Sequence, residues 1–195
     1  HSEKLQRHIK FLYTHGNIYK CFNSNLLLHG CIPLNDDGSL MNFNFDGKEL
    51  SGKNFLDYAE QIVRDAYFNR NSDENQKNSD FLWFLWCGRF SPLFGKDKMA
   101  TFERLLVKDK TSHKEKRNYY YKYQDNKTVM ENIMKDFGIT NIENAHIING
   151  HIPVKSKDGE HPVRANGKLI IIDGGFCKAY QKTTGTAGYT LIYNS

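Results

Sequence analysis

The chain has 195 residues, with 27 Lys and Arg against 22 Asp and Glu and a formal net charge of +5. This length suits one domain or a large part of one, and the mild positive charge fits an anionic substrate as well as nucleic acid. No apolar run approaches the roughly 18 residues of a membrane-spanning helix, and the charged N-terminus lacks a signal-peptide core, so we expect a cytoplasmic protein with no membrane partner. None of the four cysteines stands in a C-x-x-C pair, which predicts free thiols.

The first third of the chain predicts a helix, a strand, a hairpin and a second helix. Apolar residues recur at helical spacing over about residues 4–13, and Gly16 follows as a stop signal. Residues 25–29 form an apolar strand that ends at His29-Gly30. Residues 40–45 alternate in polarity between two turn motifs, which favours a β-hairpin. Ser51 can cap a helix that reaches about Phe68.

The middle of the chain combines a polar segment with the most apolar run. Residues 69–80 are rich in Asn, Ser and charge and predict a solvent-exposed loop. Residues 81–86 are all Phe, Leu or Trp and predict a buried strand or helix. Arg89 follows directly, so it is either one more surface guanidinium or a bidentate phosphate ligand. A further helix is predicted from Lys96 to Leu106.

The segment from His113 to Tyr123 interleaves basic and aromatic residues. Cations that meet phosphates beside rings that stack on bases are typical of nucleic-acid binding, which is the alternative function. Acidic neighbours offset the charge, however, and no known nucleic-acid motif is present. We therefore expect the tyrosines to rest on the domain, and nucleic acid is the less favoured partner.

The last third alternates helix and strand. Residues 126–137 predict a helix, an apolar strand ends at Gly150-His151, and a second apolar strand ends at Asp173. This alternation predicts an α/β fold in which a mixed β-sheet is flanked by helices. His161 lies in a charged, turn-rich segment and is expected in solvent.

His29 and His151 are the candidate metal ligands. A lone Gly-His dipeptide is more often a turn glycine beside a surface histidine. Here the pattern of an apolar strand ending in His beside Gly occurs twice. In open α/β sheets ligands bind at strand ends, and imidazole suits divalent transition metals, so the repetition favours a metal site.

The chain resembles a known family along its whole length. The matching segments, in the same order, are residues 26–33 (LLLHGCIP), 86–89 (WCGR), 94–99 (FGKDKM), 149–155 (NGHIPVK), 172–176 (IDGGF) and 188–191 (GYTL). They resemble the class III fructose-1,6-bisphosphatases of bacteria, which belong to the calcineurin-like metallophosphoesterases. Ile152, Cys177 and Thr186 depart from the family pattern, and none of these departures touches the two histidines.

The resemblance implies part of an αββα sandwich, and hydrolysis of fructose 1,6-bisphosphate to fructose 6-phosphate in gluconeogenesis at a pair of divalent metals, expected to be manganese. In the family pattern His29 and His151 bind the same metal ion. The segment from Phe176 to Gly188, predicted to be a flexible loop without the spacing of a P-loop, is similar to the loop that closes over the phosphate. The substrate-binding candidates are Arg89, Lys178, Tyr180, Gln181 and Lys182.

The superfamily motifs D-x-H, G-D-x-x-D-R-G and G-N-H-E are absent from this sequence. The resemblance therefore implies that residues 1–195 are the C-terminal portion of the catalytic domain, with an excursion at about residues 35–130. No general acid or base is expected in this chain, and the missing N-terminal half is its expected partner. We expect no activity and little ordered metal in the chain alone, and self-association into a homo-oligomer through an unpaired sheet edge. A regulatory or interaction module that needs neither histidine is a further alternative.

Overall fold

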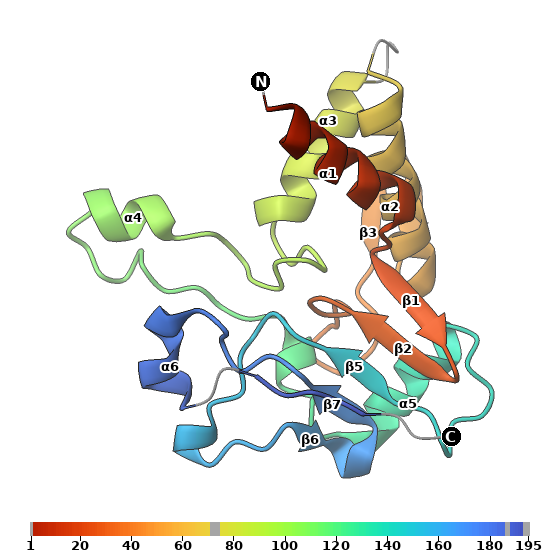
Figure 1. Ribbon diagram of the computed structural model, residues 1–195, viewed down its shortest axis with the longest axis vertical. Helices are drawn as coiled ribbons and strands as arrows, with labels where there is room; N and C mark the ends of the chain where they lie inside the picture. The colour runs from red at the N-terminus through yellow and green to blue at the C-terminus, as the bar shows by residue number, and fades with distance from the viewer. Residues whose placement is uncertain (1, 71–74, 186–187, 193–195) are drawn as a thin grey trace.

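A computed structural model describes residues 2–70, 75–185 and 188–192. Its centre is a five-stranded mixed sheet in which parallel strands lie between antiparallel edges (Figure 1). In spatial order the strands are β1 (Tyr19–Phe22), β2 (Asn25–Leu28), β5 (Ile147–Asn149), β7 (Leu169–Ile171) and β6 (Val163–Arg164). The predicted α/β class with a mixed sheet and flanking helices is confirmed.

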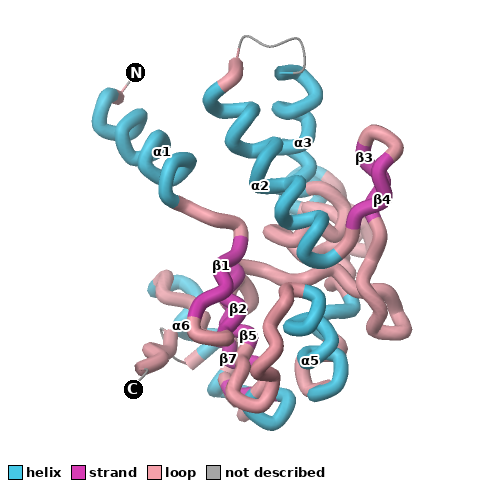
Figure 2. The backbone as a smooth tube through the Cα atoms, turned by 90° about the vertical axis from the view of Figure 1, so that its right-hand side faces the viewer, coloured by secondary structure: helices cyan, strands magenta, loops and turns pink. Residues whose placement is uncertain are grey.

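The sheet buries its central strands against α5 (Lys127–Asp136), which lies beside it in Figure 2. Leu26, Ile147 and Leu169 are completely buried, as continuous apolar strands in the middle of a sheet require. Asn126 caps α5 by accepting a hydrogen bond from the Val129 N–H at 3.1 Å. The predicted helix over residues 126–137 is confirmed to within one residue at each end.

The excursion from the sheet contains a hairpin and two long helices. Strands β3 (Phe43–Phe45) and β4 (Lys48–Leu50) form the predicted hairpin, and α2 (Gly52–Phe68) follows as predicted, although the Ser51 side chain makes no capping hydrogen bond. The hairpin packs on α2 through aromatic rings, with 4.5 Å between the ring centroids of Phe43 and Phe55. This contact gives the excursion an aromatic core of its own.

Helix α3 (Asn75–Cys87) contradicts the loop predicted for residues 69–80 and confirms the helix alternative predicted for residues 81–86. Of the expected polar loop over residues 69–80, residues 71–74 lie outside the described part, but residues 75–80 are helical and Asn78 is buried. The apolar run is helical, which is one of the two predicted alternatives, but of its residues only Phe81 and Leu85 are buried. Trp83 and Trp86 are 64% and 58% exposed, because a helix at the surface of a domain buries only one of its faces.

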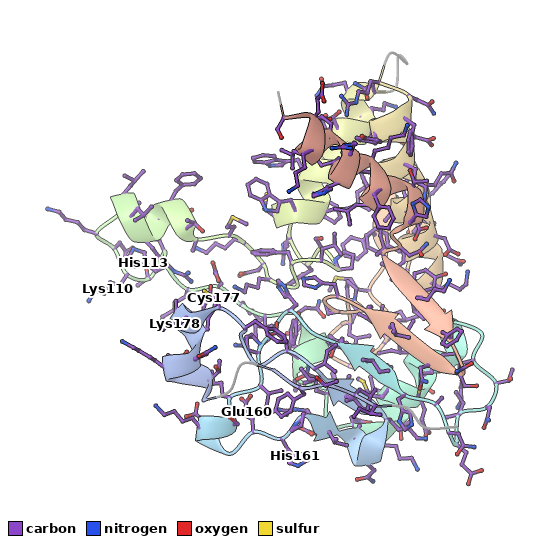
Figure 3. All side chains as sticks on the ribbon, viewed as in Figure 1. Lys110, His113, Glu160, His161, Cys177 and Lys178 are labelled. Carbon is purple, nitrogen blue, oxygen red and sulfur yellow. The ribbon has the colours of Figure 1, made fainter. Side chains whose placement is uncertain are left out.

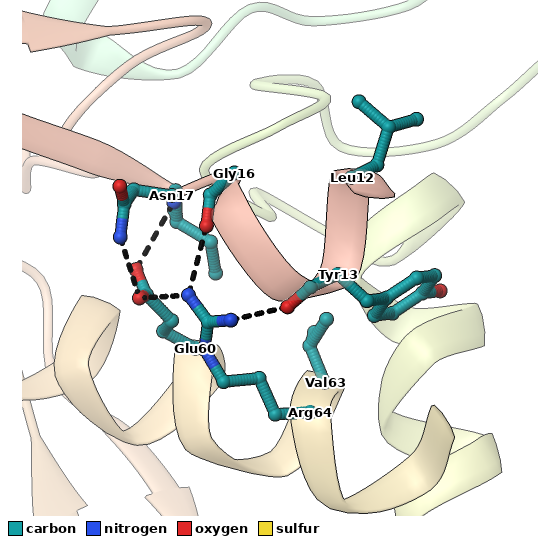
Figure 4. Close-up of a pocket in the computed structure, with 8 residues that line it drawn as sticks. Leu12, Tyr13, Gly16, Asn17, Glu60, Val63 and Arg64 are labelled. Carbon is teal, nitrogen blue, oxygen red and sulfur yellow. Dashed lines mark hydrogen bonds and ion pairs between the residues drawn. The ribbon is translucent and has the colours of Figure 1, made fainter. Parts of the chain in front are cut away.

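Helix α1 (Glu3–His15) has no buried residue and is held to α2 by polar contacts (Figure 4). The Arg64 guanidinium donates to the carbonyls of Tyr13 and Gly16 and contacts the Glu60 carboxylate at 2.7 Å. Burial raises the pKa of Glu60, but hydrogen bonds from Arg64, Asn17 and the Ile18 N–H outweigh it and leave the pKa below its ordinary value. Helix α1 is therefore anchored by this polar network together with the stacked rings of Tyr13 and Tyr67, whose centroids lie 4.2 Å apart.

An arm extends from the end of α3 and returns to the sheet (Figure 1). It carries α4 (Thr101–Leu106), so the predicted helix from Lys96 is wrong over its first five residues. Lys96 instead pairs with Arg117 across an isolated β-bridge, and its ammonium contacts Glu115 at 2.7 Å. These contacts join the outgoing and returning segments of the arm at its base.

The basic and aromatic segment rests on the domain, as expected. Tyr120, in the short 3-10 helix η1 (Tyr119–Tyr121), is completely buried, and Tyr119 and Tyr121 pack against the core. Rings held in this way present no row of free faces for base stacking.

The segment after β7 contains α6 (Lys178–Thr184), so the loop predicted there is partly wrong. Figure 3 shows Cys177 and Lys178 where this helix begins, and Thr186 lies outside the described residues. Two short 3-10 helices, η2 (Ser156–Asp158) and η3 (Ala165–Gly167), lie between β5 and β7. All four cysteines are free. Within the described ranges, no helix has the length and apolar character needed to cross a membrane.

Candidate metal centre

The two histidines follow neighbouring parallel strands. His29 comes directly after β2, and His151 comes two residues after β5. Leu27 lies opposite Ile148 in the register of the pair, so both strands release their following residues at one edge of the sheet. The predicted convergence of His29 and His151 follows from this parallel pairing.

The imidazoles meet through specific nitrogen atoms. Nε2 of His29 lies 3.1 Å from Nδ1 of His151, and the ring planes cross at 69°. Two nitrogens at this separation subtend about 95° at an ion that lies about 2.1 Å from each, the usual metal–imidazole distance. The pair is therefore spaced to bind one cation as adjacent ligands.

The second ring nitrogen of His151 is also occupied. Nε2 of His151 lies 3.1 Å from the backbone carbonyl oxygen of Phe94. When Nε2–H donates to this carbonyl, Nδ1 carries the lone pair and faces His29. A metal-binding histidine commonly has its other N–H held in this way, which fixes both tautomer and ring orientation.

Burial lowers the pKa of His151 below its ordinary value, and His29 lowers it further. The Phe94 carbonyl and Asp173 act in the opposite direction, and Lys96 opposes them. The net effect favours the neutral imidazole, which is the form that binds a metal ion.

The backbone has an unusual conformation at His151 and a close neighbour at Gly30. His151 has a φ of 65°, in the left-handed region that non-glycine residues rarely adopt. At the other site, a Cβ on Gly30 would lie 2.2 Å from the carbonyl oxygen of Pro92, so only glycine fits there. The Gly150 N–H donates to the His29 carbonyl at 3.0 Å and joins the two turns directly.

Asn149 is a buried link that sequence reasoning did not identify. Its side chain is 1% exposed, and Nδ2 donates to the Gly30 carbonyl at 2.9 Å and to the Tyr120 hydroxyl at 3.1 Å. It thus connects the end of β5 to the turn that carries His29. Only its position at the end of a strand distinguished it in the sequence.

The ligand set is incomplete within this chain. Across the described ranges, no group of three or more His, Cys, Asp or Glu side chains could hold a metal ion. His161 is exposed, as expected, and His8 and His15 are exposed as well. His29 and His151 therefore supply only part of a coordination shell.

Two cavities border His151. One, which we name the apolar groove, has a volume of about 630 Å³ and lies between the histidines and apolar side chains that include Val63, Leu85 and Met99. The other, which we name the charged pocket, has a volume of about 470 Å³. Besides His151, its charged and hydroxyl-bearing residues are Arg117, Lys155, Asp173, Tyr180, Thr183 and Thr184.

Of the predicted substrate-binding residues, only Tyr180 lines the charged pocket. Helix α6 directs Tyr180, Thr183 and Thr184 to the pocket, and this spacing places Lys178, Gln181 and Lys182 elsewhere on the helix, where they are exposed. Arg89 is exposed, stacks on the Phe90 ring and borders neither cavity. Arg117 and Lys155 also line the pocket, although neither was among the predicted substrate-binding residues.

Comparison with known proteins gives a consistent result. The family model described as Firmicute fructose-1,6-bisphosphatase matches residues 1–195. The chain is 58% identical over 195 residues to the fructose-1,6-bisphosphatase class 3 of Clostridium botulinum strain 657, and 57% identical over 196 residues to that of Clostridium tetani strain Massachusetts. Each match covers the whole chain but only 29% of the relative. No solved structure matches.

Proposed function

Because the chain belongs to the Firmicute fructose-1,6-bisphosphatase family, we propose that it is part of an enzyme that hydrolyses fructose 1,6-bisphosphate to fructose 6-phosphate and phosphate. The chain spans 29% of the length of these relatives, so the activity is proposed for the longer protein and not for these residues alone. A phosphorylated sugar as substrate and a cytoplasmic location belong to the same proposal, as does placement at the C-terminal end of a calcineurin-like metallophosphoesterase domain.

The observation that carries the proposal is the 3.1 Å separation between Nε2 of His29 and Nδ1 of His151. We propose that these two nitrogens hold one divalent cation, manganese in the proposed enzyme, and that the remaining ligands come from the rest of the protein. A pair of divalent metal ions, when bound, would lower the pKa of a bound water molecule and would hold the phosphate oxygens. The chain contributes a rigid frame, since Phe94 fixes the ring of His151 and Asn149 ties the two turns together.

The direct test is a chimera in which this chain replaces the 195 matching residues of the Clostridium botulinum enzyme. We expect Mn²⁺-dependent release of phosphate from fructose 1,6-bisphosphate, and no release from the chain alone. Replacing His29 or His151 with Ala in the chimera should lower kcat by at least about 100-fold, as loss of a metal ligand removes most of the site's affinity. His161→Ala, at an exposed histidine, is the control. A chimera that folds but is inactive, or that tolerates both substitutions, would contradict the proposal.

Self-association of the chain alone is proposed on separate grounds. Strand β1 lies at one edge of the sheet, and three of its four residues are exposed. An unpaired edge of this kind is a template for pairing with a second copy. Size-exclusion chromatography with light scattering should show dimers or larger species at high concentration, and a clean monomer would argue against them.

A further inference from the structure

The charged pocket carries two cationic side chains that no catalytic role has yet used. Arg117 lies on the segment of the arm that returns to the sheet, and Lys155 follows the turn that contains His151. The pocket volume of about 470 Å³ is within the usual range for a small-molecule site. It brings Arg117 and Lys155 together with His151 from separate parts of the chain.

The backbone of Arg117 is held firmly. Arg117 pairs with Lys96 in the β-bridge, the Asp97 N–H donates to the Lys116 carbonyl at 2.9 Å, and the Asn118 N–H donates to the Gly95 carbonyl at 2.8 Å. Hydrogen bonds on both sides therefore fix the residue, although the arm itself extends from the domain. A long side chain on such a support loses less conformational freedom when it binds a ligand.

The guanidinium of Arg117 is available for a ligand. Within the described ranges it forms no ion pair, whereas neighbouring Lys96 and Arg104 both contact Glu115. Lys155 has only a distant partner, with 3.9 Å between its ammonium and Asp158. Glu115 thus neutralises Lys96 and Arg104, while Arg117 at the pocket has no such carboxylate within the described ranges.

The charge in the pocket favours an anion. Among the described residues that line it, Asp173 is the one carboxylate, and its Oδ1 already accepts a hydrogen bond from the Gly175 N–H at 2.7 Å. Arg117 and Lys155 leave the lining with an excess of positive charge when His151 is neutral. Arg binds phosphate through two parallel N–H donors, and Lys acts as a point charge.

We propose that Arg117 and Lys155 bind the phosphate of a sugar bisphosphate that does not react, while the reacting phosphate lies toward His29 and His151. The proposal rests on the proposed function, because a substrate with two phosphates needs a second anion site away from the metal. A hexose places its terminal phosphates at opposite ends of the sugar, and the charged pocket extends from His151 to these two cations. Arg117 then holds the phosphate that the bisphosphate substrate and the fructose 6-phosphate product share.

The test measures binding to the chain itself, without metal, by two-dimensional NMR. The probes are fructose 1,6-bisphosphate, fructose 6-phosphate and inorganic phosphate at millimolar concentrations. We expect shifts at Arg117, Lys155 and the residues of α6 with both the bisphosphate and fructose 6-phosphate, because both carry the phosphate that does not react. Arg117→Met should weaken bisphosphate binding by about tenfold, as expected for one lost charged contact, whereas Lys114→Met should change it by less than about twofold. Arg117→Lys, which keeps the charge but loses the paired donors, should fall between them.

The outcomes separate this inference from the proposed function. Bisphosphate binding that persists in the His29→Ala/His151→Ala double variant and is lost in Arg117→Met supports the anion site, even if the chimera is inactive. Equal binding by Arg117→Met and the unaltered chain, or no detectable binding of the bisphosphate, overturns the inference. Fructose 6-phosphate binding that Arg117→Met leaves unchanged also overturns it.

Discussion

The two strand ends that carry histidines share one sequence pattern but use their glycines differently. At the end of β2, Gly30 is required by fit, because a Cβ there would lie 2.2 Å from the Pro92 carbonyl oxygen. After β5, a Cβ on Gly150 would lie 3.5 Å from its nearest neighbour, the Cβ of Asp173, which is ordinary contact. There the unusual backbone belongs to His151, with its φ of 65°.

One dipeptide pattern can therefore have two physical origins. Gly30 allows a loop to approach, and the Cys31 N–H bonds to the Pro92 carbonyl at 2.9 Å as a result. His151 instead occupies a conformation in which glycine would be less strained. Left-handed non-glycine residues concentrate at functional sites, where the surrounding structure holds them in place.

The largest effect is expected at Gly30. Gly30→Ala should destabilise the fold by about 3 kcal/mol, since the new methyl group collides with backbone and not with a mobile side chain. Urea denaturation followed by circular dichroism measures the change. A loss below about 0.5 kcal/mol would show that the loop after α3 can move aside.

Asn149 should come next, because it joins the two strand ends. Asn149→Ala leaves the Gly30 carbonyl and the Tyr120 hydroxyl without their buried donor, and we expect a cost of about 2 kcal/mol. Tyr120→Phe removes one of these contacts and should cost about 1 kcal/mol. If the two variants are equally stable in the same denaturation assay, Asn149 does not hold the His29 turn.

The left-handed backbone predicts an inverted order of substitutions at His151. His151→Gly should be more stable than His151→Ala by about 1 kcal/mol, because glycine adopts a positive φ without strain. At His29, whose φ is not positive, His29→Ala should be at least as stable as His29→Gly. The same order at both positions in thermal denaturation would remove the distinction between the two strand ends.

Gly150→Ala should have the smallest effect, within about 0.5 kcal/mol, since a methyl group meets only ordinary contacts there. It is the matched control for Gly30→Ala under the same conditions. A loss as large as that of Gly30→Ala would show that Gly150 is also required by fit.

Much of the fold could be predicted because it depends on local patterns. The hairpin, α2 and α5 were each predicted from the residues that form them. The N-terminal part of α3 could not be predicted in this way. Its polar residues 75–80 are helical because they continue the helix whose Phe81 and Leu85 pack on the aromatic core, a tertiary contact.

The residues of the candidate site were likewise predicted only in part. His29 and His151 were predicted as metal ligands because the strand-end pattern occurs twice, and the family resemblance implied that both bind the same ion. Arg117 and Lys155 were not predicted as pocket residues, because the return of the arm brings Arg117 to His151 across 34 positions of sequence. The helical phase of α6 decides which of its polar residues reach the pocket, and the segment was predicted to be a loop.

The most direct measurement is a Zn²⁺ titration of the chain followed through the imidazole nitrogen resonances. We expect weak binding of one ion per chain. The resonances of His29 Nε2 and His151 Nδ1 should shift at the same midpoint, while those of exposed His161 are unaffected. Shifts of His29 and His151 at different midpoints, or through their other nitrogens, would contradict a shared cation.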